Sequence, residues 1–80
     1  MNTTLYWIVE QVTPKDNYTL DLKFANGTKK TFDMKPYLEW KVYEPLKEKS
    51  FFLRAHTNGT TVVWNDKIDI APETLYEKSI

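Results

Sequence analysis

Residues 18–34 read YTLDLKFANGTKKTFDM, and this stretch decides the fold of the chain. Apolar and polar side chains alternate from Tyr18 to Phe24, and a period of two predicts a strand with one buried and one wet face. Asn26-Gly27 is a strong hairpin signal. We therefore predict that residues 28–33 return alongside the first strand as its antiparallel partner.

The register of this hairpin follows from its buried face. A two-residue loop, Asn26-Gly27, would place Phe32 on the face of polar Asp21. A three-residue loop that begins at Ala25 instead pairs Leu20 with Phe32, and a slip of one residue would turn every side chain to the other face. The second register requires a positive φ at Gly27, which glycine adopts without strain. We predict the three-residue loop.

Outside this hairpin the strict alternation of apolar and polar residues is lost. Residues 5–12 are β-branched and aromatic and predict a first strand that Pro14 closes. Residues 34–49 lose the alternation; Pro36 can open a short helix, whereas Pro45 forbids one continuous helix through the segment. We expect two helical turns, near 36–40 and 43–47, with six side chains turned partly inward: Tyr37, Leu38, Trp40, Val42, Tyr43 and Leu46.

A second hairpin is predicted around Asn58-Gly59, with strands at residues 50–57 and 60–64. A two-residue loop would pair Ala55 with Val62 and would likewise oppose Leu53 and Trp64 on one face. Residues 67–71 then predict a brief extended piece. The last helix is expected to start at Pro72 and to run to about Lys78, with Glu73 and Lys78 matching the helix dipole.

One phrase occurs twice. An Asn-Gly-Thr turn is followed by Asp-apolar-x-Pro, first with Asp33 and again with Asp69. Duplication of a half-domain and convergence on good turn chemistry both explain the echo. The predicted fold is α+β: a small antiparallel sheet of two hairpins plus an N-terminal strand, with short helices, in a single domain of residues 1–80. If the repeat reflects duplication, the domain consists of two similar halves.

The charge and cysteine counts exclude several classes of protein. Eleven basic and eleven acidic side chains give a net charge of zero, which argues against a dedicated nucleic-acid binder. Lys23, Lys29 and Lys30 cluster near one hairpin, where a solvated sheet face is the expected use. The chain has no cysteine, so disulfides and thiolate zinc sites are excluded. No long apolar stretch and no signal peptide are visible, which predicts a cytoplasmic protein without membrane contact.

The residues for catalysis or metal binding are sparse. His56 is the only histidine, and no Ser-His-Asp or Cys-His grouping can be assembled. Asp66, Asp69, Glu73 and Glu77 cluster near the end of the chain, and helix capping or a solvated face explains them better than acid–base chemistry. We expect Asp69 to cap the last helix. The expectation is a protein that is not an enzyme and needs no cofactor.

Aromatic side chains are abundant for a core of this size. Tyr and Trp are enriched at interface hot spots, so a binding surface is one use for them, and compensation for the small core is the other. Trp40 and Tyr43 are the strongest candidates, because they lie in the irregular middle segment. The full candidate set is Trp40, Tyr43, Trp64, Asp69 and Tyr76. A small-ligand pocket between the sheet and the aromatic segment is the alternative.

Residues 64–77, WNDKIDIAPETLYE, carry a family resemblance, together with the residue 18–27 strand and Phe32-Asp33-Met34. The chain resembles the bacterial domain-of-unknown-function family 2442 over nearly its whole length. The resemblance implies a small α+β domain with no established activity. Some members are fused to a helix-turn-helix domain, and others are encoded beside a small toxin-like partner. It therefore implies a regulatory or antitoxin-like role with a protein partner, without direct DNA reading, because no helix-turn-helix segment is visible up to Ile80.

Overall fold

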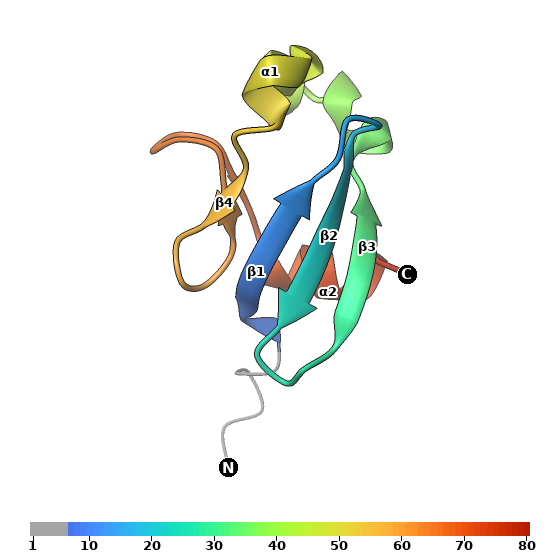
Figure 1. Ribbon diagram of the computed structural model, residues 1–80. Coiled ribbons are helices and arrows are strands. Elements are labelled where there is room, and N and C mark those ends of the chain that lie inside the picture. Colours follow the sequence, from blue (N-terminus) through green and yellow to red (C-terminus); the bar gives the residue numbers. More distant parts are fainter. Residues whose placement is uncertain (1–6) are drawn as a thin grey trace.

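The computed structural model describes residues 7–80 of the chain (Figure 1). Six strands, two 3₁₀ segments and two short α-helices follow one another. The strands are β1 (Val9–Pro14), β2 (Thr19–Phe24), β3 (Lys29–Asp33), β4 (His56–Thr57), β5 (Val62–Val63) and β6 (Asp69–Ile70). The helical elements are the 3₁₀ segments η2 (Lys35–Glu39) and η3 (Lys41–Lys47) and the α-helices α1 (Lys49–Phe52) and α2 (Pro72–Lys78). The predicted α+β class is confirmed, with the strands divided into two three-stranded antiparallel sheets.

The first sheet has the order β1-β2-β3. Leu20 pairs with Phe32, which confirms the predicted register of the central hairpin. Gly27 has a φ of +88°, as the three-residue loop requires. Leu20, Leu22 and Phe24 are all buried, so the alternation in the sequence marks the core face of the sheet correctly.

The first strand starts later than predicted. Of the predicted range 5–12, residues 5 and 6 lie outside the described residues, and the strand itself runs from Val9 to Pro14. Val9 pairs with Phe24 and Gln11 with Lys23, so Glu10 forms a β-bulge. The Val9 N–H donates to the Thr60 carbonyl at 2.9 Å, and the Thr57 hydroxyl donates to the Val9 carbonyl at 3.0 Å. The start of β1 therefore joins the two sheets.

The predicted second hairpin is wrong in extent and register. Residues 49–52 are helical (α1), and β4 contains only His56 and Thr57, which pair with Val63 and Val62. The loop is wider than two residues because side chains accept hydrogen bonds from its backbone N–H groups. Asn58 Oδ1 accepts the N–H groups of Thr60 and Thr61, each at 3.0 Å. Gly59 donates to the Thr57 hydroxyl at 3.0 Å.

The two predicted helical turns are confirmed as η2 and η3, with Pro36 at the start of η2 and Pro45 inside η3. Leu38, Tyr43 and Leu46 are buried as expected. Trp40 and Val42 are not, since 56% and 54% of these side chains are exposed. Trp40 joins the two segments with an extended backbone (φ −76°, ψ 138°), and this break in the helix places its side chain outside the core.

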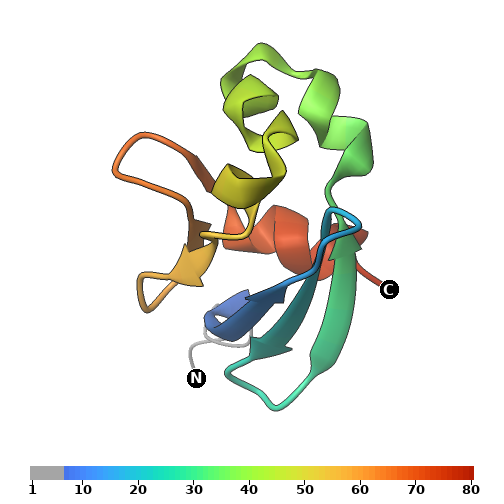
Figure 2. The same cartoon turned by 45° about the horizontal axis from the view of Figure 1, so that its top comes forward.

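The core lies between the first sheet, helix α2 and the second sheet. Figure 2 shows α2 crossing behind the first sheet, with the helical segments of residues 35–52 at one end. The predicted start of α2 at Pro72 is confirmed. One buried cluster includes Leu20, Phe24 and Phe32 from the first sheet, Phe52 from α1, Val62, Trp64 and Ile70 from the second half, and Leu75 from α2.

The two sheets repeat one plan, since each runs through three sequential strands into a helix. The repeated phrase follows this plan only in part. Asp33 and Asp69 both lie at the last strand before a helix. Asn26-Gly27, however, joins the second and third strands of its sheet, whereas Asn58-Gly59 joins the first and second.

Candidate functional site

The five residues predicted as binding candidates do not form one site. Trp64 is a core residue, with 1% of its surface exposed. Its indole N–H donates to the Phe52 carbonyl at 2.9 Å, and its ring lies 6.1 Å from that of Phe52. A buried indole with a satisfied N–H stabilises the fold. Of the two uses expected for the aromatic residues, Trp64 thus serves the core.

Tyr37, Trp40 and Tyr43 contact one another in sequence along the helical segments, edge to face between Tyr37 and Trp40 and stacked between Trp40 and Tyr43, and we call these three side chains the aromatic row. The ring centroids of Tyr37 and Trp40 are 5.3 Å apart, and those of Trp40 and Tyr43 are 6.0 Å apart. A three-residue turn brings each pair together: the Trp40 N–H donates to the Tyr37 carbonyl at 3.1 Å, and the Tyr43 N–H donates to the Trp40 carbonyl at 3.0 Å. At the inner end Tyr37 stacks on buried Phe32 at 5.2 Å, which anchors the row to the core.

Tyr43 is the most buried member of the aromatic row. Its hydroxyl donates to the backbone carbonyl of Asp69 at 3.2 Å and so ties η3 to β6. Burial raises the pKa of the Tyr43 hydroxyl above its ordinary value, and the charges of Asp69 and Tyr37 raise it further. Tyr43 therefore supports the ring of Trp40 by stacking on it, and Trp40 is the most exposed member of the aromatic row.

Asp69 does not cap the last helix, so that prediction is wrong. The residue at the cap position of α2 is Ala71, and no side chain caps the helix. Asp69 is exposed in β6, and its backbone carbonyl makes the contact with Tyr43. With Pro at the first helical position one N–H is already absent, so the need for a side-chain cap is reduced.

Tyr76 lies on α2 beside the β2–β3 loop, at the opposite end of that hairpin from η2. Its ring packs edge-on against Phe24 at 4.8 Å, and the Lys30 ammonium lies 4.3 Å from its centroid. Lys30 also donates to the Tyr76 carbonyl at 2.8 Å. Hydrogen bonds from Asn26 and Thr28 lower the pKa of the Tyr76 hydroxyl. These contacts attach α2 to the first sheet.

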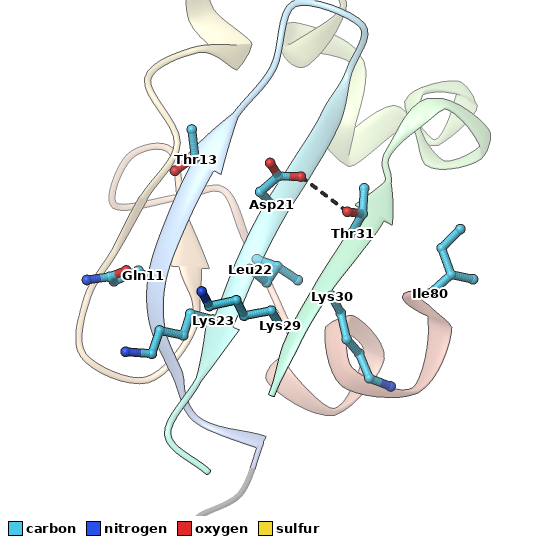
Figure 3. A pocket seen from close by; sticks show the side chains of 9 residues that line it. All are labelled: Gln11, Thr13, Asp21, Leu22, Lys23, Lys29, Lys30, Thr31 and Ile80. Atoms are coloured by element: carbon cyan, nitrogen blue, oxygen red, sulfur yellow. Dashed lines mark hydrogen bonds between the residues drawn. The ribbon is translucent and has the colours of Figure 1, made fainter. Parts of the chain in front are cut away.

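The first sheet also carries a polar hollow of about 350 Å³ on its outer face (Figure 3). Cross-strand pairing arranges its side chains in two rows, Gln11–Lys23–Lys29 and Thr13–Asp21–Thr31. Lys23 also lies 3.6 Å from Glu10, and Asp21 lies 3.1 Å from Lys15. Positive and negative groups thus alternate on this face, as expected for a solvated sheet surface.

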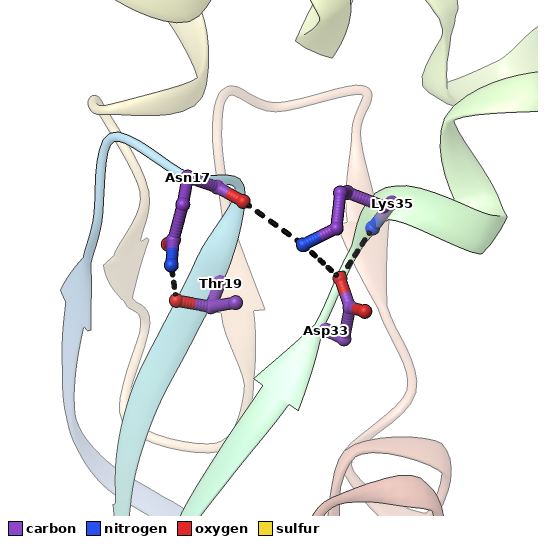
Figure 4. Close-up of polar contacts among 4 residues, drawn as sticks. All are labelled: Asn17, Thr19, Asp33 and Lys35. Carbon is purple, nitrogen blue, oxygen red and sulfur yellow. Dashed lines mark hydrogen bonds and ion pairs between the residues drawn. The ribbon is translucent and has the colours of Figure 1, made fainter.

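A polar cluster joins the β1–β2 turn to the end of β3 (Figure 4). Asp33 Oδ1 accepts the Lys35 backbone N–H at 3.0 Å and lies 3.1 Å from the Lys35 ammonium. That ammonium also donates to the Asn17 carbonyl at 3.2 Å. Burial opposes ionisation of Asp33, but the two hydrogen bonds and the charge of Lys35 together outweigh it and hold the pKa of Asp33 below its ordinary value.

Residues 7–80 contain no group of three His, Cys, Asp or Glu side chains that could hold a metal ion. His56 is exposed, and its Nδ1 lies 3.0 Å from the Arg54 carbonyl. In the same part of the chain, no helix has the length and apolar content needed to cross a membrane.

A family match covers almost the whole described structure. The DUF2442 family of proteins of unknown function matches residues 9–80, from the start of β1 to Ile80. The chain belongs to the DUF2442 family. The match includes both sheets, the aromatic row and α2 of this DUF2442 protein. No curated protein and no solved structure matches the chain.

Proposed function

We propose that this DUF2442 domain is a non-enzymatic protein-binding module and that Trp40 is its anchor. One observation carries the proposal: 56% of the Trp40 surface is exposed although the ring contacts Tyr37 edge to face and stacks on Tyr43. Trp is the side chain most typical of interface hot spots. Val42, 54% exposed, extends the apolar surface beside it in the chain.

The aromatic row favours a macromolecular partner because it holds Trp40 in place before binding. The ring of Tyr37 stacks on buried Phe32, and the hydroxyl of Tyr43 donates to the Asp69 carbonyl, so both neighbours of Trp40 are held by the core. Since an anchor already held in its bound orientation loses less conformational entropy on binding, a pre-ordered Trp raises affinity. The setting implied by the family resemblance adds a narrower proposal: an antitoxin-like or regulatory role in the cytoplasm, with a small toxin-like protein as the partner.

The test is capture of a partner from the native cell, followed by measurement of its affinity for variants. Trp40→Ala is expected to weaken binding at least ~30-fold, because loss of an interface anchor costs about 2 kcal/mol or more. Leu53→Ala is the matched control, since Leu53 is 42% exposed but lies outside the aromatic row. Tyr43→Phe keeps the ring in place and is expected to bind nearly normally.

Folding of each variant is verified by thermal melting before binding is compared. Equal affinity of Trp40→Ala and the native protein would move the interface away from the aromatic row. A larger loss with Leu53→Ala than with Trp40→Ala would place it near α1.

A small-ligand site is the second candidate function. An open hollow of about 350 Å³ lies between the β1–β2 turn and the helical segments and is lined by Tyr18, Lys35, Leu38, Glu39 and Lys47. Native mass spectrometry of the purified protein tests it. A small molecule that stays with the folded protein, combined with failure to capture any protein, would favour this function.

A further inference from the structure

The outer edge of β3 is paired with no other strand of the first sheet. β3 is the outer strand of the first sheet and pairs with β2 on one side only. On its other side Thr31 donates to the Ile80 carbonyl at 2.8 Å, and Ile80 donates to the Thr31 carbonyl at 3.0 Å. Two residues that exchange both bonds form a hydrogen-bonded antiparallel pair. Thr31 thus already pairs with Ile80, which lies beside β3 (Figure 3).

Alternation along β3 gives this edge a simple composition. Because alternate residues direct their backbone groups to the same side, Lys29 and Asp33 face the same edge as Thr31. Their side chains lie on the same face as that of Thr31. Along this edge the side chains are those of exposed Lys29, half-buried Thr31 and exposed Asp33.

We propose that two copies of the chain pair antiparallel along β3, about a twofold axis at Thr31, to form one continuous six-stranded sheet. In this register Lys29 lies opposite Asp33 of the second copy, and Asp33 lies opposite Lys29 of the second copy. Thr31 faces its own counterpart. Directly opposed residues of opposite charge stabilise an antiparallel pair. A shift of the axis by one residue in either direction would lose both Lys–Asp pairs.

The charges around Lys29 favour this partner. Lys29 lies directly opposite Lys23 within the first sheet, an arrangement that is unfavourable for like charges. Lys23 is near Glu10, whereas Lys29 has no ion-pair partner within residues 7–80. Both Lys35 contacts with Asp33 use Oδ1. Oδ2 of Asp33 in the second copy makes no contact with Lys35 and can therefore accept a hydrogen bond from the Lys29 ammonium.

Ile80 is the intramolecular competitor for this edge. It occupies the backbone groups of Thr31, but 95% of its own surface is exposed, so only its backbone bonds hold it there. Pairing of two copies must displace it. Ile80→Pro, which removes the N–H that bonds to Thr31, is therefore expected to increase pairing.

Cysteine cross-linking tests the register. The chain has no cysteine, so Thr31→Cys introduces a single thiol. Hydrogen-bonded antiparallel neighbours have Cα atoms about 5.5 Å apart, within the range of a disulfide. Oxidation of dilute Thr31→Cys protein is expected to give a covalent dimer. Thr13→Cys is the matched control, because it lies in the same row of the sheet but on β1, and it is expected to remain monomeric.

Charge exchange tests the partner. By sedimentation velocity, Lys29→Asp alone and Asp33→Lys alone should each lose the dimer, because each opposes like charges twice. An equimolar mixture of the two should restore it as a heterodimer. Should Asp33→Lys fail to fold without its Lys35 contacts, the Lys29 variants decide: Lys29→Arg must keep the dimer and Lys29→Asp must lose it.

Several outcomes would overturn the proposal. One is a wild-type protein that stays monomeric at millimolar concentration while Thr31→Cys and Thr13→Cys cross-link equally. Another is a mixture of the charge variants that dimerises no better than either alone. Binding of an added extended peptide at Thr31, without self-association, would replace the second copy by a peptide. None of these results bears on Trp40, so the proposed function is tested separately.

Discussion

The β1–β2 and β2–β3 loops have the same pattern of backbone hydrogen bonds but different residues at the key position. Lys15 donates to the Thr19 carbonyl at 2.8 Å, and Phe24 donates to the Thr28 carbonyl at 2.8 Å. In each loop the third residue donates back to the residue before the loop, Tyr18 at 3.2 Å and Gly27 at 2.9 Å. That third residue has a positive φ in both, +66° for Tyr18 and +88° for Gly27.

The difference separates a loop that is stable by itself from one that the rest of the molecule holds. Glycine takes a positive φ without cost, whereas a bulky residue there is strained by about 1–3 kcal/mol. Tyr18 keeps this strained backbone because its ring packs edge-on against Phe52 at 5.1 Å and its hydroxyl donates to the Lys47 carbonyl at 2.5 Å. The strained loop therefore binds the helical segments to the first sheet.

Tyr18→Ala is expected to have the largest effect on stability. Alanine keeps the strained backbone but loses both the packing on Phe52 and the hydrogen bond to Lys47, and the free energy of unfolding should fall by about 2–4 kcal/mol. Urea denaturation measures it. Tyr18→Gly loses the same contacts without the strain, so it should be more stable than Tyr18→Ala. Equal stability of these two variants would contradict a strained backbone.

Gly27→Ala is expected to have the next largest effect, a loss of about 1–2 kcal/mol. A Cβ atom at Gly27 would meet nothing within 4 Å, so the loss comes from backbone conformation alone. Thermal melting measures it, and Gly59→Ala, with a φ of +96° and equally open surroundings, is the matched comparison. An unchanged melting temperature would mean that the positive φ is not needed at Gly27.

Tyr18→Phe isolates the hydroxyl. The ring contact with Phe52 is retained, and only the bond to the Lys47 carbonyl is lost, so stability should fall by about 1 kcal/mol. The same urea titration provides the value. A loss as large as that of Tyr18→Ala would assign the role of Tyr18 to its hydroxyl instead of its ring.

Asp33 is expected to give the smallest effect, visible as a dependence on pH. Its pKa is lower in the folded protein than the ordinary 3.8, so its contribution is present above that value and is lost as the pH falls through the lower folded pKa. Because 52% of the side chain is exposed, solvent screening keeps the effect small.

Melting temperatures of the native protein and Asp33→Asn should therefore converge as the pH is lowered from ~5 to ~2. Asp69→Asn, which removes an exposed carboxylate that caps no helix, serves as the control. A constant difference between native protein and Asp33→Asn across this range would show that the charge of Asp33 has no stabilising role.

Sequence reasoning succeeded where neighbouring residues decide the structure. The register of Leu20 with Phe32, the positive φ of Gly27 and the start of α2 at Pro72 all follow from alternation, glycine and proline. It failed at Asn58-Gly59, although the dipeptide is the same as at Asn26-Gly27. A strand of two residues has too little alternation of apolar and polar side chains to define a register. In addition, the Thr57 and Asn58 side chains accept backbone N–H groups of the loop, and this makes the loop wider.

For the candidate binding residues, too, the sequence predicted the local structure but not which side chains are buried. The sequence by itself determined that Trp40 and Tyr43 lie in an irregular helical segment, because the prolines and the loss of alternation are local signals. Only the tertiary structure decided that Trp64 is buried against Phe52 and that Trp40 is exposed, because burial depends on which distant segments meet. The same holds for Tyr18, whose strained backbone persists only because Phe52 and Lys47, far along the chain, provide its contacts.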